Sequence, residues 1–169
     1  MATVSTGLDE FNRRSAGQAE QALLACCAAP DFARTVAGRR PYPDVEAVVA
    51  VADAALRRLS WPEVAQALAA HPRIGERPTG TGTEADWSRR EQSGVDGADQ
   101  ETRAALDRAN REYEQRFGHL FLVFADGRTD LELLAAARRR LGNDPGTERE
   151  VVRNELRQIA LLRLRRLLS

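Results

Sequence analysis

Residues 147–168 have the sequence TEREVVRNELRQIALLRLRRLL. Apolar residues recur in this stretch at intervals of three and four, which is the spacing of one face of an α-helix. They are Val152, Leu156, Ile159, Ala160, Leu164 and Leu167. Thr147 and Glu150 have the spacing of a capping box, so we expect the helix to begin there. The stretch therefore predicts a long helix with one apolar face.

The rest of the chain has similar patterns, separated by Gly and Pro. We expect further helices over residues 15–28, 31–36, 44–59, 60–71, 84–92 and 98–117, and one that starts at Thr129. Ser60 with Glu63, and Thr129 with Glu132, make two more capping-box pairs. These patterns predict an all-α fold, a single compact multi-helix domain over residues 1–169.

Two short segments are expected to lie outside the helices. Residues 40–43 should be extended, because a residue before a proline is pushed out of the helical region. Residues 120–124 are consecutive large apolar residues, and two interpretations stay open for them. They form either a short buried strand or an extended segment of the core.

Composition excludes several function classes. The chain of 169 residues has 25 basic and 25 acidic residues, and this balance argues against a non-specific nucleic-acid binder. Every basic residue is arginine, which excludes Schiff-base chemistry, pyridoxal-phosphate attachment and a lysine-dependent P-loop. Cys26 and Cys27 are adjacent and make neither a disulfide framework nor a zinc site on their own.

We also expect no targeting signal in the sequence. No apolar run approaches the roughly 18 residues of a membrane span. The first residues have neither a basic start nor an apolar core, so we do not expect a signal peptide. We expect a cytoplasmic protein without a membrane partner.

The first candidate for chemistry is His71. It follows Val64 by seven residues and Leu68 by three, so we expect it on the apolar face at the end of that helix, just before Pro72. A histidine held at a helix end beside a polar loop is suited to proton transfer near neutral pH. The alternative is a partly buried histidine that satisfies a helix-end carbonyl.

The second candidate is a polar helix face. Ser88, Glu91 and Gln92 are spaced so that they lie on one side of a short helix. A hydroxyl, a carboxylate and an amide that converge could hold a polar ligand or orient a histidine. The alternative is a solvated helix face.

The third candidate is Arg163, which falls within the apolar stripe of the last helix, four residues after Ile159. An arginine directed into a core costs several kcal/mol unless it is paired. Its partner could be a structural carboxylate or an anionic ligand held by the two-pronged guanidinium. His119 is a weaker candidate, either a second site residue or a turn residue.

Four motifs occur together in one order along the chain. They are His71-Pro72-Arg73-Ile74-Gly75, Ser88-x-x-Glu91-Gln92-x-Gly94, Tyr113-x-x-x-Phe117-Gly118 and Ile159-x-x-x-Arg163-Leu164. In these motifs the chain resembles the 2-oxo-4-hydroxy-4-carboxy-5-ureidoimidazoline (OHCU) decarboxylase family of purine degradation, in its bacterial form. The resemblance extends over nearly the whole chain.

The resemblance implies a cofactor-independent, metal-free homodimer that converts OHCU to (S)-allantoin. It places the catalytic histidine on His71 and the substrate arginine on Arg163. As a mechanistic hypothesis, we expect Glu91 to join His71 in proton transfer. It places substrate-binding residues at Pro72, at Ser88, Arg89, Arg90, Glu91 and Gln92, and at Phe121, Leu122, Val123, Phe124 and Ala125. An association with the hydroxyisourate hydrolase, the preceding enzyme, is left open.

Two other interpretations remain. In one, the chain is a helical protein-interaction module in which Arg163 makes a structural ion pair. In the other, a related ureide hydrolase or lyase uses the same pocket on another substrate.

Overall fold

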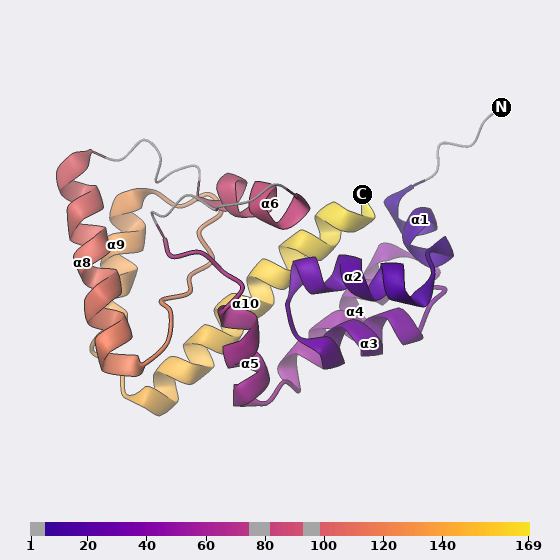
Figure 1. Cartoon of the computed structure of the whole chain (residues 1–169), viewed down its shortest axis with the longest axis horizontal. Coiled ribbons are helices and arrows are strands. Elements are labelled where there is room, and N and C mark those ends of the chain that lie inside the picture. The colour runs from indigo at the N-terminus through magenta and orange to yellow at the C-terminus, as the bar shows by residue number, and fades with distance from the viewer. Residues whose placement is uncertain (1–5, 75–81, 93–98) are drawn as a thin grey trace. The chain divides into compact units, whose positions relative to one another are not determined.

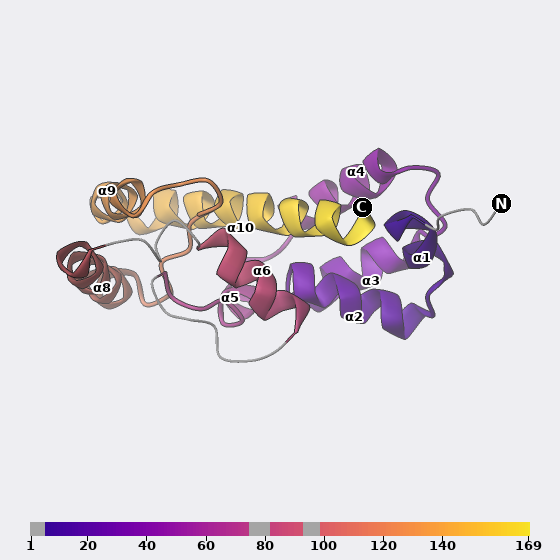
Figure 2. The same ribbon diagram turned by 90° about the horizontal axis from the view of Figure 1, so that it is seen from above.

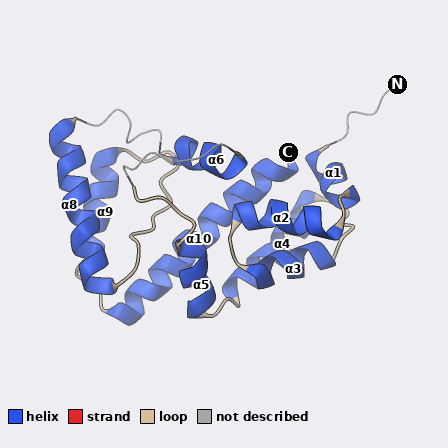
Figure 3. Ribbon diagram, viewed as in Figure 1, coloured by secondary structure: helices blue, strands red, loops and turns tan. Residues whose placement is uncertain are grey.

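The structure is a computed structural model that describes residues 6–74, 82–92 and 99–169. Its helices are α1 (Gly7–Arg13), α2 (Ala16–Cys26), α3 (Pro30–Gly38), α4 (Val45–Arg57), α5 (Trp61–Leu68), α6 (Thr83–Glu91), α8 (Gln100–Phe117), α9 (Asp130–Arg140) and α10 (Pro145–Leu168) (Figure 1). Over these described ranges no strand is formed, which confirms the all-α fold class (Figure 3).

The chain divides into two compact units. The first comprises Met1–Ala67 with Arg157–Ser169, and the second comprises Leu68–Leu156, so that α10 contributes to both. The expectation of one domain over residues 1–169 stays a prediction. No helix in the described part of the chain combines the length and the apolar character that a membrane crossing needs.

The first unit is built around three consecutive helices. α2 packs on α3 and α3 packs on α4, as both views of the ribbon show (Figures 1 and 2). Between α3 and α4 the chain lies outside the helices at residues 40–43, as predicted, and side chains hold it there. Arg40 donates hydrogen bonds to the carbonyls of Phe11 and Arg14, and the hydroxyl of Tyr42 donates to the Val36 carbonyl.

Two capping boxes occur where the sequence predicts them. The backbone N–H of Ser60 donates to the Glu63 carboxylate, and the N–H of Glu63 donates to the Ser60 hydroxyl. Thr129 and Glu132 make the same reciprocal pair at the start of α9. These contacts depend only on residues three apart, so local sequence is enough to predict them.

The predicted start of the last helix is wrong. α10 begins at Pro145 and not at Thr147. Asp144 takes the capping role, because its carboxylate accepts hydrogen bonds from both the N–H and the hydroxyl of Thr147. Proline is well suited to the first helical position, since its missing N–H would have no partner there. Glu150 instead pairs with Arg153.

Helix α1 was not expected from the sequence. It opens with a capping box between Thr6 and Asp9, but it is one of the shortest helices, with 7 residues. Phe11 is its one fully buried side chain, so the segment has no apolar stripe for a periodicity argument to detect.

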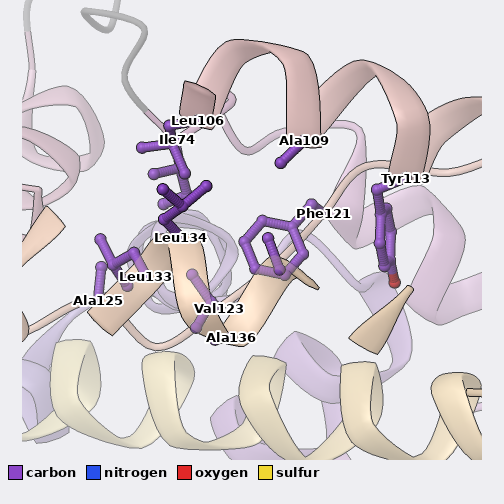
Figure 4. Packing of buried hydrophobic residues seen from close by; sticks show 11 residues of the cluster. Ile74, Leu106, Ala109, Tyr113, Phe121, Val123, Ala125, Leu133, Leu134 and Ala136 are labelled. Carbon is purple, nitrogen blue, oxygen red and sulfur yellow. The ribbon is translucent and has the colours of Figure 1, made fainter. Parts of the chain in front are cut away.

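The second unit contains α8 and α9 packed side by side (Figures 1 and 2). Its core, drawn in Figure 4, consists of Ile74, Leu106, Ala109, Tyr113, Phe121, Val123, Ala125, Leu133, Leu134, Ala136 and Ala137. Residues 120–125 enter this core without helix or strand structure. Of the two interpretations left open for them, the structure supports the extended core segment.

Candidate functional site

His71 lies in a turn beyond the end of α5. The helix ends at Leu68, and the backbone N–H of His71 donates to the Leu68 carbonyl at 3.0 Å. The expected continuation of the helix to residue 71 is therefore wrong, since the chain turns away before Pro72. Both His71 and Pro72 are half-buried, so the imidazole is held by the protein and still reaches solvent.

The residues after His71 are attached to α8. The carbonyl of Ile74 accepts a hydrogen bond from the side-chain amide of the buried Asn110 at 2.9 Å. Arg73 forms an ion pair with Glu114 one helical turn further along α8. These two contacts fix the backbone on the C-terminal side of His71.

Helix α6 buries its polar side chains. Ser88, Glu91 and Gln92 are 3%, 7% and 9% exposed, so the solvated-face interpretation of this helix is wrong. Arg89 and Arg90 lie on the exposed side, where Arg89 pairs with Asp86. A buried carboxylate, hydroxyl and amide on one helix face form a polar surface that can bind and orient a polar ligand.

The segment from Phe121 to Ala125 is held through its backbone. Arg140 donates from NH1 to the Leu122 carbonyl at 2.6 Å, and the N–H of Phe124 donates to the Glu155 carboxylate at 3.0 Å. The side chains of Phe121, Leu122, Val123 and Ala125 are buried and that of Phe124 is half-buried. The side chains therefore serve the core, and peptide groups are what the segment can offer a ligand.

A buried ion pair supports this segment. Glu148 is fully buried and accepts hydrogen bonds from the Tyr113 hydroxyl at 2.5 Å, from Nε of Arg140 at 2.7 Å and from the side chain of Asn143 at 3.0 Å. Burial and the hydrogen bond to the Glu148 carboxylate raise the pKa of Tyr113 above its ordinary value. Tyr113 therefore stays protonated and serves as a donor.

Aromatic rings close around the same ion pair. The Arg140 guanidinium lies over the Phe121 ring, 4.6 Å from its centroid, and the rings of Tyr113 and Phe121 lie beneath α8 (Figure 4). His119 packs edge-on against Tyr113, with the ring centroids 5.5 Å apart. His119 thus has a packing role within this cluster.

Arg163 belongs to the first unit. It is only 1% exposed, and its NH1 donates to the Ala25 carbonyl at 3.2 Å. Burial raises the pKa of the nearby Cys27 thiol to about 12, and the positive charge of Arg163 opposes this rise. The last helix thus holds a guanidinium in its apolar stripe, as predicted. At the C-terminal end of this stripe the predicted residue Leu167 is half-buried, and its neighbour Leu168 is buried.

The structure therefore places most predicted site residues in buried or half-buried positions. His71, Pro72, the polar face of α6 and residues 121–125 lie in the second unit, and Arg163 lies in the first. The convergence of His71, Glu91 and Arg163 stays a prediction. Among the residues with described positions, no group of three His, Cys, Asp or Glu side chains could hold a metal ion.

Arg140, Glu148 and Glu155 were not singled out from the sequence. Glu148 lies four residues before Val152, so it falls on the same face as the apolar stripe. Arg140 follows the buried Leu133 by seven residues and Ala137 by three. Charged residues at core positions are costly unless paired, and this signal could have identified both.

Comparisons with known proteins agree on one family. The model of the family described as OHCU decarboxylase matches residues 12–165. The chain is 31% identical over 148 residues to the "Uric acid degradation bifunctional protein TTL" of Arabidopsis thaliana, covering 85% of this chain and 45% of that protein. It is 34% identical over 96 residues to the 2-oxo-4-hydroxy-4-carboxy-5-ureidoimidazoline decarboxylase of Amia calva, covering 56% of this chain and 55% of that protein. The chain thus spans about half the length of these two relatives.

Solved structures give the same result. The chain is similar to a crystal structure of OHCU decarboxylase in the presence of (S)-allantoin, with a TM-score of 0.76 and 26% identity, covering 89% of this chain and 98% of that one. A crystal structure of (S)-allantoin synthase matches with a TM-score of 0.72 at 15% identity, covering 96% of this chain and 53% of that one, and this likeness concerns the fold alone.

Proposed function

The chain belongs to the OHCU decarboxylase family, and on this premise we propose that it decarboxylates OHCU to (S)-allantoin in urate degradation. The observation that carries the proposal is the family match, which extends from residue 12 in α1 to residue 165 in α10. The buried polar face of α6 supports it, because an ordinary packing helix would bury apolar residues there.

Decarboxylation breaks the bond between the ring carbon and the carboxylate carbon. Carbon dioxide leaves, and the electron pair of the broken bond stays on the substrate, where the imidazoline ring can accept it. A proton must then be returned to one face of the ring to give a single enantiomer. The protein must therefore hold an anionic substrate, move protons and shield one face.

The residues divide between these tasks in our proposal. His71 and Glu91 handle the proton of the 4-hydroxyl group and the proton returned to the ring, with the acid and base roles not assigned between them. Arg163 binds an anionic or carbonyl oxygen of the substrate through its guanidinium. Ser88, Gln92 and the peptide groups of residues 121–125 hold the ureido group and the ring, with Pro72, Arg89 and Arg90 completing the site.

The proposal extends to the surroundings of the enzyme. We propose a cytoplasmic homodimer that needs neither metal nor organic cofactor. An association with the hydroxyisourate hydrolase would deliver OHCU directly, which matters because OHCU also decays without an enzyme.

The test generates OHCU in the cuvette from urate with urate oxidase and hydroxyisourate hydrolase. The purified protein is added, and the circular dichroism of allantoin is followed over time. A rapid (S)-allantoin signal is the expected result. Slow racemic product from folded protein would refute the proposal and favour the interaction-module interpretation.

A further inference from the structure

The segment from Phe121 to Ala125 forms neither helix nor sheet, and we take its backbone as extended. In an extended chain the N–H and C=O groups of successive residues point to opposite edges. Buried peptide groups nearly always have a hydrogen-bond partner. Each edge of this segment therefore needs its own hydrogen-bond partners.

Charged side chains occupy one edge. The Leu122 carbonyl accepts from NH1 of Arg140 at 2.6 Å, and the Phe124 N–H donates to Glu155 at 3.0 Å. Both peptide groups belong to even-numbered residues, so both contacts are on the same edge. Hydrogen bonds that involve an ionised group are stronger and shorter than neutral ones, so this edge is firmly held.

The opposite edge presents the peptide groups of Phe121 and Val123. Within the described ranges no hydrogen bond from the backbone of either residue is found, although their side chains are only 1% and 2% exposed. Further along this edge, the Ala125 carbonyl accepts from the N–H of Arg128. Phe121 and Val123 thus leave peptide groups available to a ligand.

Arg140 is itself fixed in place. Its Nε bonds to the fully buried Glu148, its NH1 bonds to Leu122, and its guanidinium lies over the Phe121 ring. One planar guanidinium thus makes contacts in several directions at once. A lysine ammonium is a point charge without this fixed geometry.

We propose that Arg140 and Glu155 are positioning residues that fix one edge of this segment, so that the peptide groups of Phe121 and Val123 face the substrate. The inference rests on the proposed function. It assigns no proton transfer to either residue, because both act through the backbone of the segment.

The first test compares three variants of α10. Glu155→Ala removes the acceptor for the Phe124 N–H, and Glu155→Gln keeps an acceptor oxygen in the same position. Glu150→Ala is the matched control. It removes the same charge from the same helix, but the Glu150 side chain is 75% exposed. We expect the KM for OHCU to rise about tenfold in Glu155→Ala and to stay within about twofold in the other two variants.

The second test does not need turnover. (S)-Allantoin is titrated into the 15N-labelled protein, and the amide resonances of Phe121 and Val123 are followed by NMR. We expect both to shift in the wild type, in Glu155→Gln and in Glu150→Ala, and to shift much less in Glu155→Ala. Amide exchange at Phe124 should be at least about tenfold faster in Glu155→Ala, because its hydrogen bond is lost.

The outcomes separate the inference from the proposed function. An active wild type whose KM and amide shifts are unchanged in Glu155→Ala would overturn the inference and leave the function intact. Equal losses in Glu155→Ala and Glu155→Gln would also overturn it. An inactive wild type that shows the expected pattern of allantoin shifts would refute the function and support the positioning role.

Discussion

The Arg73 guanidinium and the Glu114 carboxylate form a two-point ion pair, with Nε 2.5 Å from Oε1 and NH2 2.9 Å from Oε2. The pair joins the turn that carries His71 to α8. Its side chains are 46% and 26% exposed, so solvent screens the attraction. The parallel geometry still fixes the direction of the ion pair, which suits a turn next to the histidine that we propose as catalytic.

This pair predicts a pH-dependent contribution to stability. The hydrogen bonds from Arg73 hold the pKa of Glu114 below its ordinary value of 4.5. A carboxyl group whose pKa is lower in the folded protein stabilises the fold above its unfolded pKa, and this contribution disappears as the pH falls through the folded value. Glu114→Gln should therefore lower the free energy of unfolding by up to about 1 kcal/mol near neutral pH.

Urea unfolding of wild type and Glu114→Gln at a series of pH values measures this difference. It should shrink as the pH falls below the ordinary pKa, and it should approach zero below the lowered pKa of the folded protein, where the wild-type carboxyl group is protonated as well. The double variant Arg73→Gln/Glu114→Gln shows whether Arg73 is the partner. A difference that stays constant into acid would contradict the assignment.

Gly7 allows the two ends of the first unit to approach closely. A Cβ at this position would lie 2.5 Å from the carbonyl oxygen of Ser169 and 2.7 Å from that of Leu167. These neighbours are backbone atoms, so relief requires a helix end to move. We expect Gly7→Ala to lower the free energy of unfolding by about 1–3 kcal/mol.

Gly17 provides the matched control, since it lies near the start of α2 and a Cβ added there would have no atom within 4 Å. Gly17→Ala should be neutral or should raise the free energy of unfolding by up to about 1 kcal/mol. Thermal unfolding of Gly7→Ala and Gly17→Ala tests these two predictions. Equal unfolding midpoints for the two variants would contradict the close approach at Gly7.

The two cysteines should be unreactive in the folded protein. Cys26 and Cys27 are 0% and 1% exposed, and burial raises the pKa of the Cys27 thiol to about 12. Since the thiolate is the reactive form, very little is present near neutral pH. A disulfide reagent should therefore label neither thiol in the native protein and both after denaturation. Rapid labelling of the native protein would contradict the described burial.

Arg163 should not tolerate replacement by lysine. The residue is buried, and a lysine cannot reproduce the directed N–H groups that hold a backbone carbonyl and, in our proposal, a substrate oxygen. We expect Arg163→Lys to lower kcat/KM for OHCU by about 100-fold or more, which is about 2.7 kcal/mol of transition-state stabilisation.

Arg165→Lys is the control for this prediction. Arg165 lies on the same helix but pairs at the surface with Glu46. Its replacement should leave kcat/KM within about twofold, because a surface pair contributes little. An Arg163→Lys variant with near wild-type kinetics would remove Arg163 from the site.

Local sequence was sufficient to predict most of the helices, though not α1, and to single out the polar residues of α6. Capping boxes and apolar periodicity depend on neighbours within a few residues, so the starts of α5 and α9 and the burial of Leu156 could be predicted. The start of α10 could not, because two capping signals competed and Asp144 with Pro145 prevailed over Thr147.

Contacts distant in sequence account for what was missed. Glu148 binds Tyr113, 35 residues away, and Glu155 binds the Phe124 amide, 31 residues away. No periodicity within one helix specifies such partners. The family resemblance inferred from the motifs is confirmed by the family match, whereas the role of each site residue stays a prediction.

The most direct test of the account follows the optical activity of allantoin formed from freshly generated OHCU, with wild type and His71→Asn measured side by side. We predict a rapid (S)-allantoin signal from the wild type. With His71→Asn we predict only slow racemic product, with the helical circular dichroism spectrum unchanged. A folded wild type that gives racemic product, or a His71→Asn variant that still gives (S)-allantoin at the wild-type rate, would contradict the account.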